Sequence, residues 1–166
     1  HVIGVREGRI LTDRHVLPHD HASVVRISVL ERYGHGGKPA NAYATGFGKL
    51  GGAIASSVGH DSHNLIVVGS NVRDMRAALA ALAEMGGGFA VVRDGSVVAS
   101  LPLAFGGLMS TEGPEAVVQG LTELRAASAA IGCELKEPFL QLAFLSLPVI
   151  PSLKLTDRGL VQSMLL

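Results

Sequence analysis

The segment from Ser56 to Asn64 holds the densest set of side chains in this sequence that could bind a ligand or move a proton. It contains two imidazoles, one carboxylate, three hydroxyls and one amide. His60 and His63 are three residues apart, so a helical turn or a tight loop brings both rings to one side. Asp61 can fix a histidine tautomer or carry a proton. These residue types indicate acid–base chemistry or contact with a heterocyclic ligand.

Two interpretations of this segment remain open on residue chemistry alone. In the functional one, the catalytic candidates are His60, Asp61 and His63. Ser62 and Asn64 are then substrate-binding candidates, because hydroxyls and amides suit the ring nitrogens of a heterocycle. In the structural one, the Asp, Asn and Ser side chains bond the loop's own backbone. Loops that precede a rigid central strand often carry site residues, which favours function.

Three other motifs carry weaker signals. His19-Asp20-His21 has the spacing by which a strand aims two imidazoles at one metal, but no further ligand completes the set, so we expect a solvated loop. Residues 46–51 match G-x-G-x-x-G without a clear helix after them, which favours a glycine-permitted turn over a nucleotide loop. Cys133 is isolated, and a core or surface thiol is expected there. No metal ligands are assigned to this chain.

The composition indicates one globular domain spanning residues 1–166. Hydrophobic residues make up 48% and charged residues 17% of the chain, and the net charge is zero. No basic stripe with interleaved aromatics occurs, so we expect no nucleic-acid partner. No apolar run approaches the roughly 20 residues of a membrane helix, so we expect no membrane partner. The single cysteine fits a reducing, cytoplasmic compartment.

The apolar pattern predicts an α+β fold, with a mixed or antiparallel sheet and hairpins packed against two or three helices. Asn71 and Gly86 have the residue types that begin and end a helix. Pro114 and Pro138 are placed to open two more, reaching about residues 131 and 147. Asp94-Gly95 between two β-prone runs predicts a hairpin. The remaining strands are expected at residues 5–11, 24–30, 41–47 and 65–68, and the tail at 153–160 is expected to be loop-like or briefly extended.

Several motifs together carry a family resemblance. They are Gly46-Phe47-Gly48, residues 52–64 with their His-Asp-Ser-His-Asn core, Ile66-Val67-Val68-Gly69, Met85-Gly86-Gly87-Gly88, Leu101-Pro102-Leu103, Gly107-Leu108-Met109-Ser110, Leu147-Pro148-Val149-Ile150-Pro151 and residues 153–161. In these segments the chain resembles the C-terminal region of bacterial adenine deaminases, from about residue 5 to residue 161.

The resemblance implies hydrolysis of adenine to hypoxanthine and ammonia in purine salvage. In that family the chemistry belongs to an amidohydrolase barrel that holds manganese or iron, and a metal-bound hydroxide attacks the purine. A (β/α)₈ barrel needs about 250 residues, more than this chain has, and the sequence starts at His1 rather than Met. From the resemblance we therefore expect a C-terminal domain that lacks its barrel, is inactive without it, and binds no metal alone.

The leading hypothesis is that residues 60–64 complete the active site of the N-terminal amidohydrolase barrel of the same protein. The expected partners are then that barrel, adenine and further copies of the protein in a homo-oligomer. A second hypothesis is a non-catalytic structural or oligomerisation module whose apolar helix, residues 139–147, docks on a partner domain. A third is a stand-alone protein that binds a purine-like ligand.

Overall fold

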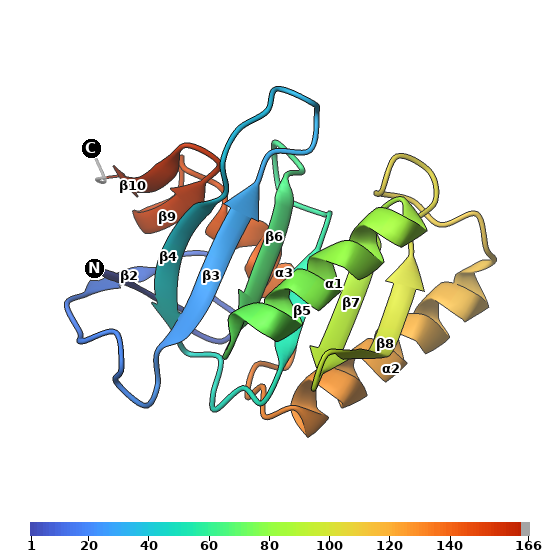
Figure 1. The fold of residues 1–166 in the computed structure, drawn as a ribbon, viewed down its shortest axis with the longest axis horizontal. Coiled ribbons are helices and arrows are strands. Elements are labelled where there is room, and N and C mark those ends of the chain that lie inside the picture. Colours follow the sequence, from blue (N-terminus) through green and yellow to red (C-terminus); the bar gives the residue numbers. More distant parts are fainter. Residues whose placement is uncertain (164–166) are drawn as a thin grey trace.

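The computed structural model describes residues 1–163, and eight of their strands form one mixed sheet (Figure 1). The strand order is β2-β1-β4-β3-β6-β5-β7-β8, and every neighbouring pair is antiparallel except β1 with β4. The strands are β1 (Val2–Gly4), β2 (Asp13–His15), β3 (Val25–Leu30), β4 (Ala40–Thr45), β5 (Ala53–Ser56), β6 (Leu65–Gly69), β7 (Gly88–Arg93) and β8 (Ser96–Pro102).

Helices cover both faces of this sheet. Helix α1 (Val72–Met85) lies across one face, as Figure 1 shows. Helices α2 (Pro114–Ala130) and α3 (Pro138–Leu145) pack on the other face, together with a separate hairpin of β9 (Ser152–Thr156) and β10 (Gly159–Ser163). The larger apolar core fills the space under α2, α3 and β9, and a smaller one lies under α1.

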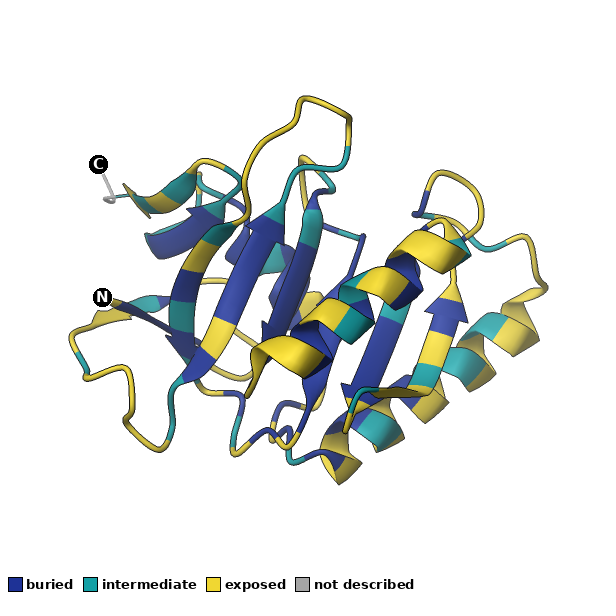
Figure 2. Cartoon of the chain, in the orientation of Figure 1, coloured by how far each residue is buried: buried dark blue, intermediate teal, exposed yellow. Residues whose placement is uncertain are grey.

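The α+β prediction, with a mixed sheet and three helices, is confirmed. The three helices begin at the predicted caps and prolines, and the Asp94-Gly95 turn joins β7 to β8 with both residues at positive φ. Strand β6 is buried at the centre of the sheet, because its apolar run has a strand on either side and a helix on each face (Figure 2). The residue types at helix caps and at this turn therefore correctly predicted where the helices begin and where the hairpin turns.

Three strand predictions were wrong or incomplete. The N-terminal pair consists of residues 2–4 and 13–15, with only the turn at Glu7-Gly8 inside the predicted range 5–11. Residues 53–56, whose sequence was ambiguous for helix, form the fully buried strand β5. The tail, predicted to be loop-like or briefly extended, forms the paired β9–β10 hairpin. Strands β1 and β5 each pair with a strand distant in sequence, β4 and β7 respectively, whereas the local β9–β10 hairpin is held in place by distant contacts such as that of Thr12 with Leu153.

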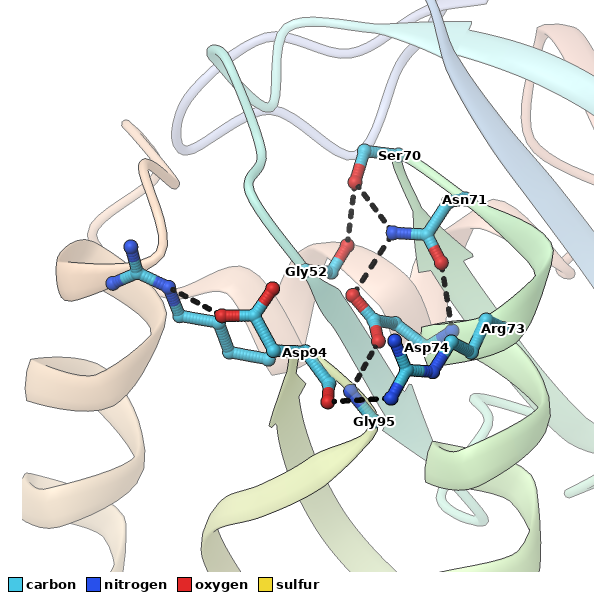
Figure 3. Close-up of polar contacts among 8 residues, drawn as sticks. Gly52, Ser70, Asn71, Arg73, Asp74, Asp94 and Gly95 are labelled. Carbon is cyan, nitrogen blue, oxygen red and sulfur yellow. Dashed lines mark hydrogen bonds and ion pairs between the residues drawn. The ribbon is translucent and has the colours of Figure 1, made fainter.

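A polar cluster fixes the start of α1 to the turn between β7 and β8 (Figure 3). The Asn71 side chain caps the helix by accepting from the Asp74 backbone N–H at 2.8 Å. The buried Asp74 carboxylate accepts from Asn71 Nδ2 at 2.9 Å and from the Gly95 N–H at 2.7 Å. Arg73 adds a bond to the Asp94 carbonyl at 3.1 Å. The carboxylate thus joins two elements and faces the positive end of the helix dipole.

We predict that Asp74→Ala lowers the free energy of unfolding by about 2–3 kcal/mol, because it removes two hydrogen bonds to a charged, buried acceptor. Urea denaturation followed by circular dichroism measures the change. Glu84→Ala, an exposed acid on the same helix, is the control and should change stability by less than about 0.5 kcal/mol. Equal effects of the two substitutions would contradict the prediction.

Lys154 of β9 is a fully buried lysine whose amine donates to the Ile10 carbonyl at 2.7 Å. Within residues 1–163 it forms no ion pair with a carboxylate. Burial lowers the pKa of Lys154 from its ordinary 10.5 to about 8, because desolvation penalises the charged form. Between these values the unfolded chain holds a proton that the folded chain has lost, so Lys154 makes stability rise with pH in this window.

We predict that the stability of the native sequence rises relative to that of Lys154→Met by about 1–2 kcal/mol between pH 7 and pH 10, because methionine cannot titrate. Denaturation of both proteins across this pH range tests the difference. Lys136→Met, at an exposed position, serves as the control and should show a flat difference. A flat difference for Lys154→Met as well would contradict the assigned effect of burial.

No helix within residues 1–163 combines the length and apolar character needed to cross a membrane.

Candidate functional site

Three loops meet at one edge of the sheet. They connect β3 to β4 (residues 31–39), β5 to β6 (residues 57–64) and β8 to α2 (residues 103–113). Neighbouring strands here are antiparallel, so the end of one strand and the start of the next lie at the same edge. Figure 1 shows the three loops together at the top of the view. We call this group the loop cluster.

Arg32 connects all three loops of the cluster. Its Nε donates to the His63 carbonyl at 2.7 Å, and its Nη2 donates to the Gly106 carbonyl at 2.9 Å. The neighbouring Tyr33 hydroxyl donates to the Ser62 carbonyl at 2.7 Å. These bonds all reach backbone atoms, so they define the path of residues 62–63 without engaging the side chains of that loop.

Ser57 holds the base of the cluster. Its buried Oγ accepts from the Gly88 N–H at 2.7 Å and donates to the Gly107 carbonyl at 2.6 Å. The chain passes close by at Gly87, where a Cβ atom would lie only 2.4 Å from Gly107 Cα. Glycine is therefore required at Gly87 for loop 103–113 to reach the loop that carries the histidines.

His60, in the loop between β5 and β6, packs against helix α3. Its backbone N–H donates to the Ala143 carbonyl at 3.1 Å, and its ring stacks at 4.8 Å from the ring of Phe144. The His60 side chain is nevertheless exposed, as are Asp61 and Ser62. Residues 60–62 therefore expose an imidazole, a carboxylate and a hydroxyl, while hydrogen bonds with α3, Arg32 and Tyr33 hold the backbone of this loop.

His63 and Asn64 form the buried end of the segment. The Nδ1 atom of His63 and the Oδ1 atom of Asn64 are shielded from solvent, and neither has a hydrogen-bond partner within the described chain. Buried polar atoms are normally paired. His63 also has a φ of 50°, an uncommon backbone conformation for a residue other than glycine. Uncommon backbone conformations cluster at functional sites, so this end of the segment stays a candidate for contact with a ligand or partner.

The geometry limits what these side chains can do by themselves. Within residues 1–163, no hydrogen bond joins the side chains of His60, Asp61 and His63 to one another, so they form no assembled acid–base pair. Ser62 has no general base bonded to its hydroxyl in the described chain, which gives no support to a nucleophilic serine. The loop can contact a ligand or another protein surface, but it does not form a complete reaction centre.

The residues present do not fit a manganese or iron site. Across the described part of the chain, no three His, Cys, Asp or Glu side chains gather in a way that could hold a metal ion. His19 and Asp20 lie in an exposed turn, and the His21 ring bonds Ser23 Oγ at 2.9 Å. The described residues of this chain therefore supply no set of ligands for such a metal.

The other two motifs have structural roles. Residues 46–51 form the turn between β4 and β5, with Gly46 and Gly48 at positive φ, and a strand rather than a helix follows. The arrangement that a dinucleotide loop requires is therefore missing at this turn. Burial raises the pKa of the Cys133 thiol above its ordinary value, so the thiol stays protonated and is a poor nucleophile at neutral pH.

Helix α3 does not supply the docking face of the second hypothesis. Six of its eight residues are buried within this chain, and Leu140 is its exposed large apolar side chain. The predicted end at residue 147 is two residues late, since the helix ends at Leu145. Its apolar character therefore reflects packing against β5 and β6.

Sequence reasoning missed Arg32, Tyr33 and Ser57 as organisers of the cluster. Ser57 lies within the segment from Ser56 to Asn64, but its residue type alone does not indicate that it bonds Gly88 and Gly107. Arg32 and Tyr33 lie at the start of a Gly-rich segment. The glycines predict a loop there, but they do not reveal which atoms the two side chains bond. The one available signal was the glycine pair Gly106-Gly107 in a separate loop, because adjacent glycines often mark a close backbone approach.

The strand order and the three helices define an α+β domain, and comparison with known proteins gives its family. The family described as adenine deaminase C-terminal domain matches residues 6–164, so this chain belongs to that family. It is 49% identical to an adenine deaminase of Brucella abortus over 96% of its own length, and 49% identical to adenine deaminase 1 of Rhizobium meliloti over 97%. The chain spans only 29% and 30% of those relatives.

We predict that Arg32→Gln accelerates amide hydrogen exchange in residues 60–64 and 105–109 by about 10-fold, because losing the bonds to His63 and Gly106 frees both loops. Exchange measured by mass spectrometry reports each loop separately. Arg158→Gln, in an exposed turn of the β9–β10 hairpin, should leave both loops unchanged. Unchanged exchange in Arg32→Gln would show that these bonds do not hold the cluster.

Proposed function

We propose that this domain is part of an adenine deaminase and contributes residues 60–64 to its active site. The enzyme would hydrolyse adenine to hypoxanthine and ammonia. Membership of the family and the names of the relatives, which are adenine deaminases, support the reaction. The partial coverage of those relatives supports a larger partner, which we take to be an amidohydrolase barrel of the same protein.

The unpaired atoms of His63 and Asn64 are the observation that carries the assignment of this loop. A buried donor or acceptor without a partner costs about 1–3 kcal/mol, and two consecutive residues each carry one here. A neighbouring surface or a bound purine that supplies their hydrogen bonds would remove this cost. We therefore expect the domain to contact the rest of the site at His63 and Asn64.

Each residue of the segment has a role suited to its exposure. His60 and Asp61 are exposed, so they can reach a partner site and assist proton movement there. Ser62 would donate to or accept from the substrate, and Asn64 would present Oδ1 to an amino or ring N–H group. His63, at the base, would orient its neighbours and help to exclude bulk water.

The chemical step itself is assigned outside this chain. A divalent metal, manganese or iron by the family resemblance, would supply the activated water in the barrel. The residues of this chain would position substrate and close the site. We further propose a role in purine salvage in the cytoplasm and assembly into a homo-oligomer, both of which rest on the resemblance.

The test is made in an intact adenine deaminase that carries this domain. His60→Ala and His63→Ala should each lower kcat/KM for adenine by at least about 10-fold, because positioned acid–base groups contribute 10²–10⁴-fold. A larger effect on kcat than on KM would favour proton transfer over simple binding. Steady-state kinetics on metal-loaded enzyme measures both parameters.

His19→Ala is the matched control, because His19 is exposed and lies outside the loop cluster. Circular dichroism and thermal denaturation establish that each variant is folded. Losses below about 10-fold in folded His60 and His63 variants would overturn the active-site role. A fall in stability with turnover intact would instead favour the structural-module hypothesis.

A further inference from the structure

A groove lies beside α1, on the side of the sheet opposite α3. It has a volume of about 700 Å³ and runs between α1 and the part of β3 and β4 that the helix leaves uncovered. Figure 1 shows β3 and β4 bare beside α1 in this view. The residues that line the groove are Arg26, Ile27, Ser28, Leu30, Pro39, Asn41, Ala42, Tyr43, Val67, Val72, Met75, Arg76 and Leu79.

The walls of this groove combine apolar surface with one aromatic ring. Met75 and Leu79 of α1 provide apolar side chains along one wall, and Leu30 continues the apolar surface on β3. On the sheet side, Tyr43 presents its ring, with the Arg26 guanidinium 5.9 Å from the ring centroid. A flat apolar or aromatic body fits such a surface, and the volume lies in the range of pockets for small organic ligands.

The charge of the groove has one sign. Arg26 and Arg76 are among its lining residues, and none of those residues is Asp or Glu. The ion pairs in residues 1–163 involve other arginines, so neither guanidinium has a carboxylate partner in the described chain. This local excess stands out because the chain as a whole has zero net charge. Guanidinium groups bind carboxylate and phosphate oxygens through paired hydrogen bonds.

We propose that this groove binds a small organic anion, with a flat ring against the apolar wall and a phosphate or carboxylate held by the guanidinium groups. The polar side chains Ser28 and Asn41 are bonded to each other at 2.6 Å. Asn41 also donates to the Pro39 carbonyl at 3.2 Å, so its amide is already engaged. Specificity therefore comes from charge and ring shape rather than from free amide or hydroxyl groups.

This inference goes beyond the proposed function and does not depend on it. The groove lies on the α1 face, whereas the His60 loop rests on α3 at the other face. Binding can be measured with this chain alone, without a barrel. Failure of one proposal therefore leaves the other in place.

Calorimetry with four probes tests the site. Adenosine 5′-monophosphate combines a ring with a phosphate, and 2-naphthoate combines a ring with a carboxylate. Adenosine supplies the ring without the phosphate, and inorganic phosphate supplies the anion without the ring. We expect at least one aromatic anion to bind with a Kd below about 1 mM, and adenosine and phosphate to bind at least about 10-fold more weakly. The ranking of the two anions identifies the preferred head group.

Substitutions locate the binding on the molecule. Arg26→Gln and Arg76→Gln should each weaken the aromatic anion by about 10-fold, the size of one lost charged hydrogen bond. Both residues are exposed, so the variants should fold, as circular dichroism can verify. Arg158→Gln has the same charge change on the β9–β10 hairpin, which contributes no residue to the groove and packs on the other face of the sheet, so this variant should bind like the native sequence.

Three results would overturn the proposal. In the first, neither aromatic anion binds with a Kd below about 1 mM, the affinity expected of the site. In the second, Arg158→Gln weakens binding as much as the groove variants do, which would indicate a general charge effect. In the third, a polyglutamate peptide binds in an Arg26-dependent manner while both small anions fail, which would identify the groove as a docking surface for an acidic protein segment.

Discussion

Antiparallel pairing of β6 with both β3 and β5 is the constraint on which the loop cluster depends. Strand β6 is the central apolar run, and its two partners pair with it over five and four residues. This pairing returns the chain to the same edge of the sheet after each strand, so loops from separate parts of the sequence meet there. A parallel arrangement would have separated the histidine loop from Arg32.

The parts of the fold that could be predicted from sequence are those decided by neighbours along the chain. Asn71, Gly86 and the Asp94-Gly95 turn have conformations set by their own side chains or by the lack of one. Strand β5 is different, because Ala53-Ile54-Ala55-Ser56 has no strong preference and becomes a strand only between β6 and β7. The β9–β10 tail likewise acquires its surroundings from residues about 140 positions earlier, such as Thr12 with Leu153.

The candidate site shows the same division. Residue types alone made the His60 segment a candidate, and they left its functional and structural interpretations open. The exposure of His60 and the burial of Asn64 depend on α3 and β6, which sequence spacing does not reveal. Arg32 could not be identified as the connecting residue, since its two acceptors lie 31 and 74 residues away.

The anchoring of the His60 loop through backbone atoms has a consequence for how such a domain can evolve. Arg32 and Tyr33 bond carbonyl groups, and His60 is held by its own N–H, so the path of the loop does not depend on the identities of residues 60–62. Side chains at these positions can change while the loop keeps its shape. Selection, or an engineer, can therefore explore new contacts at this edge in single steps, each starting from a folded protein.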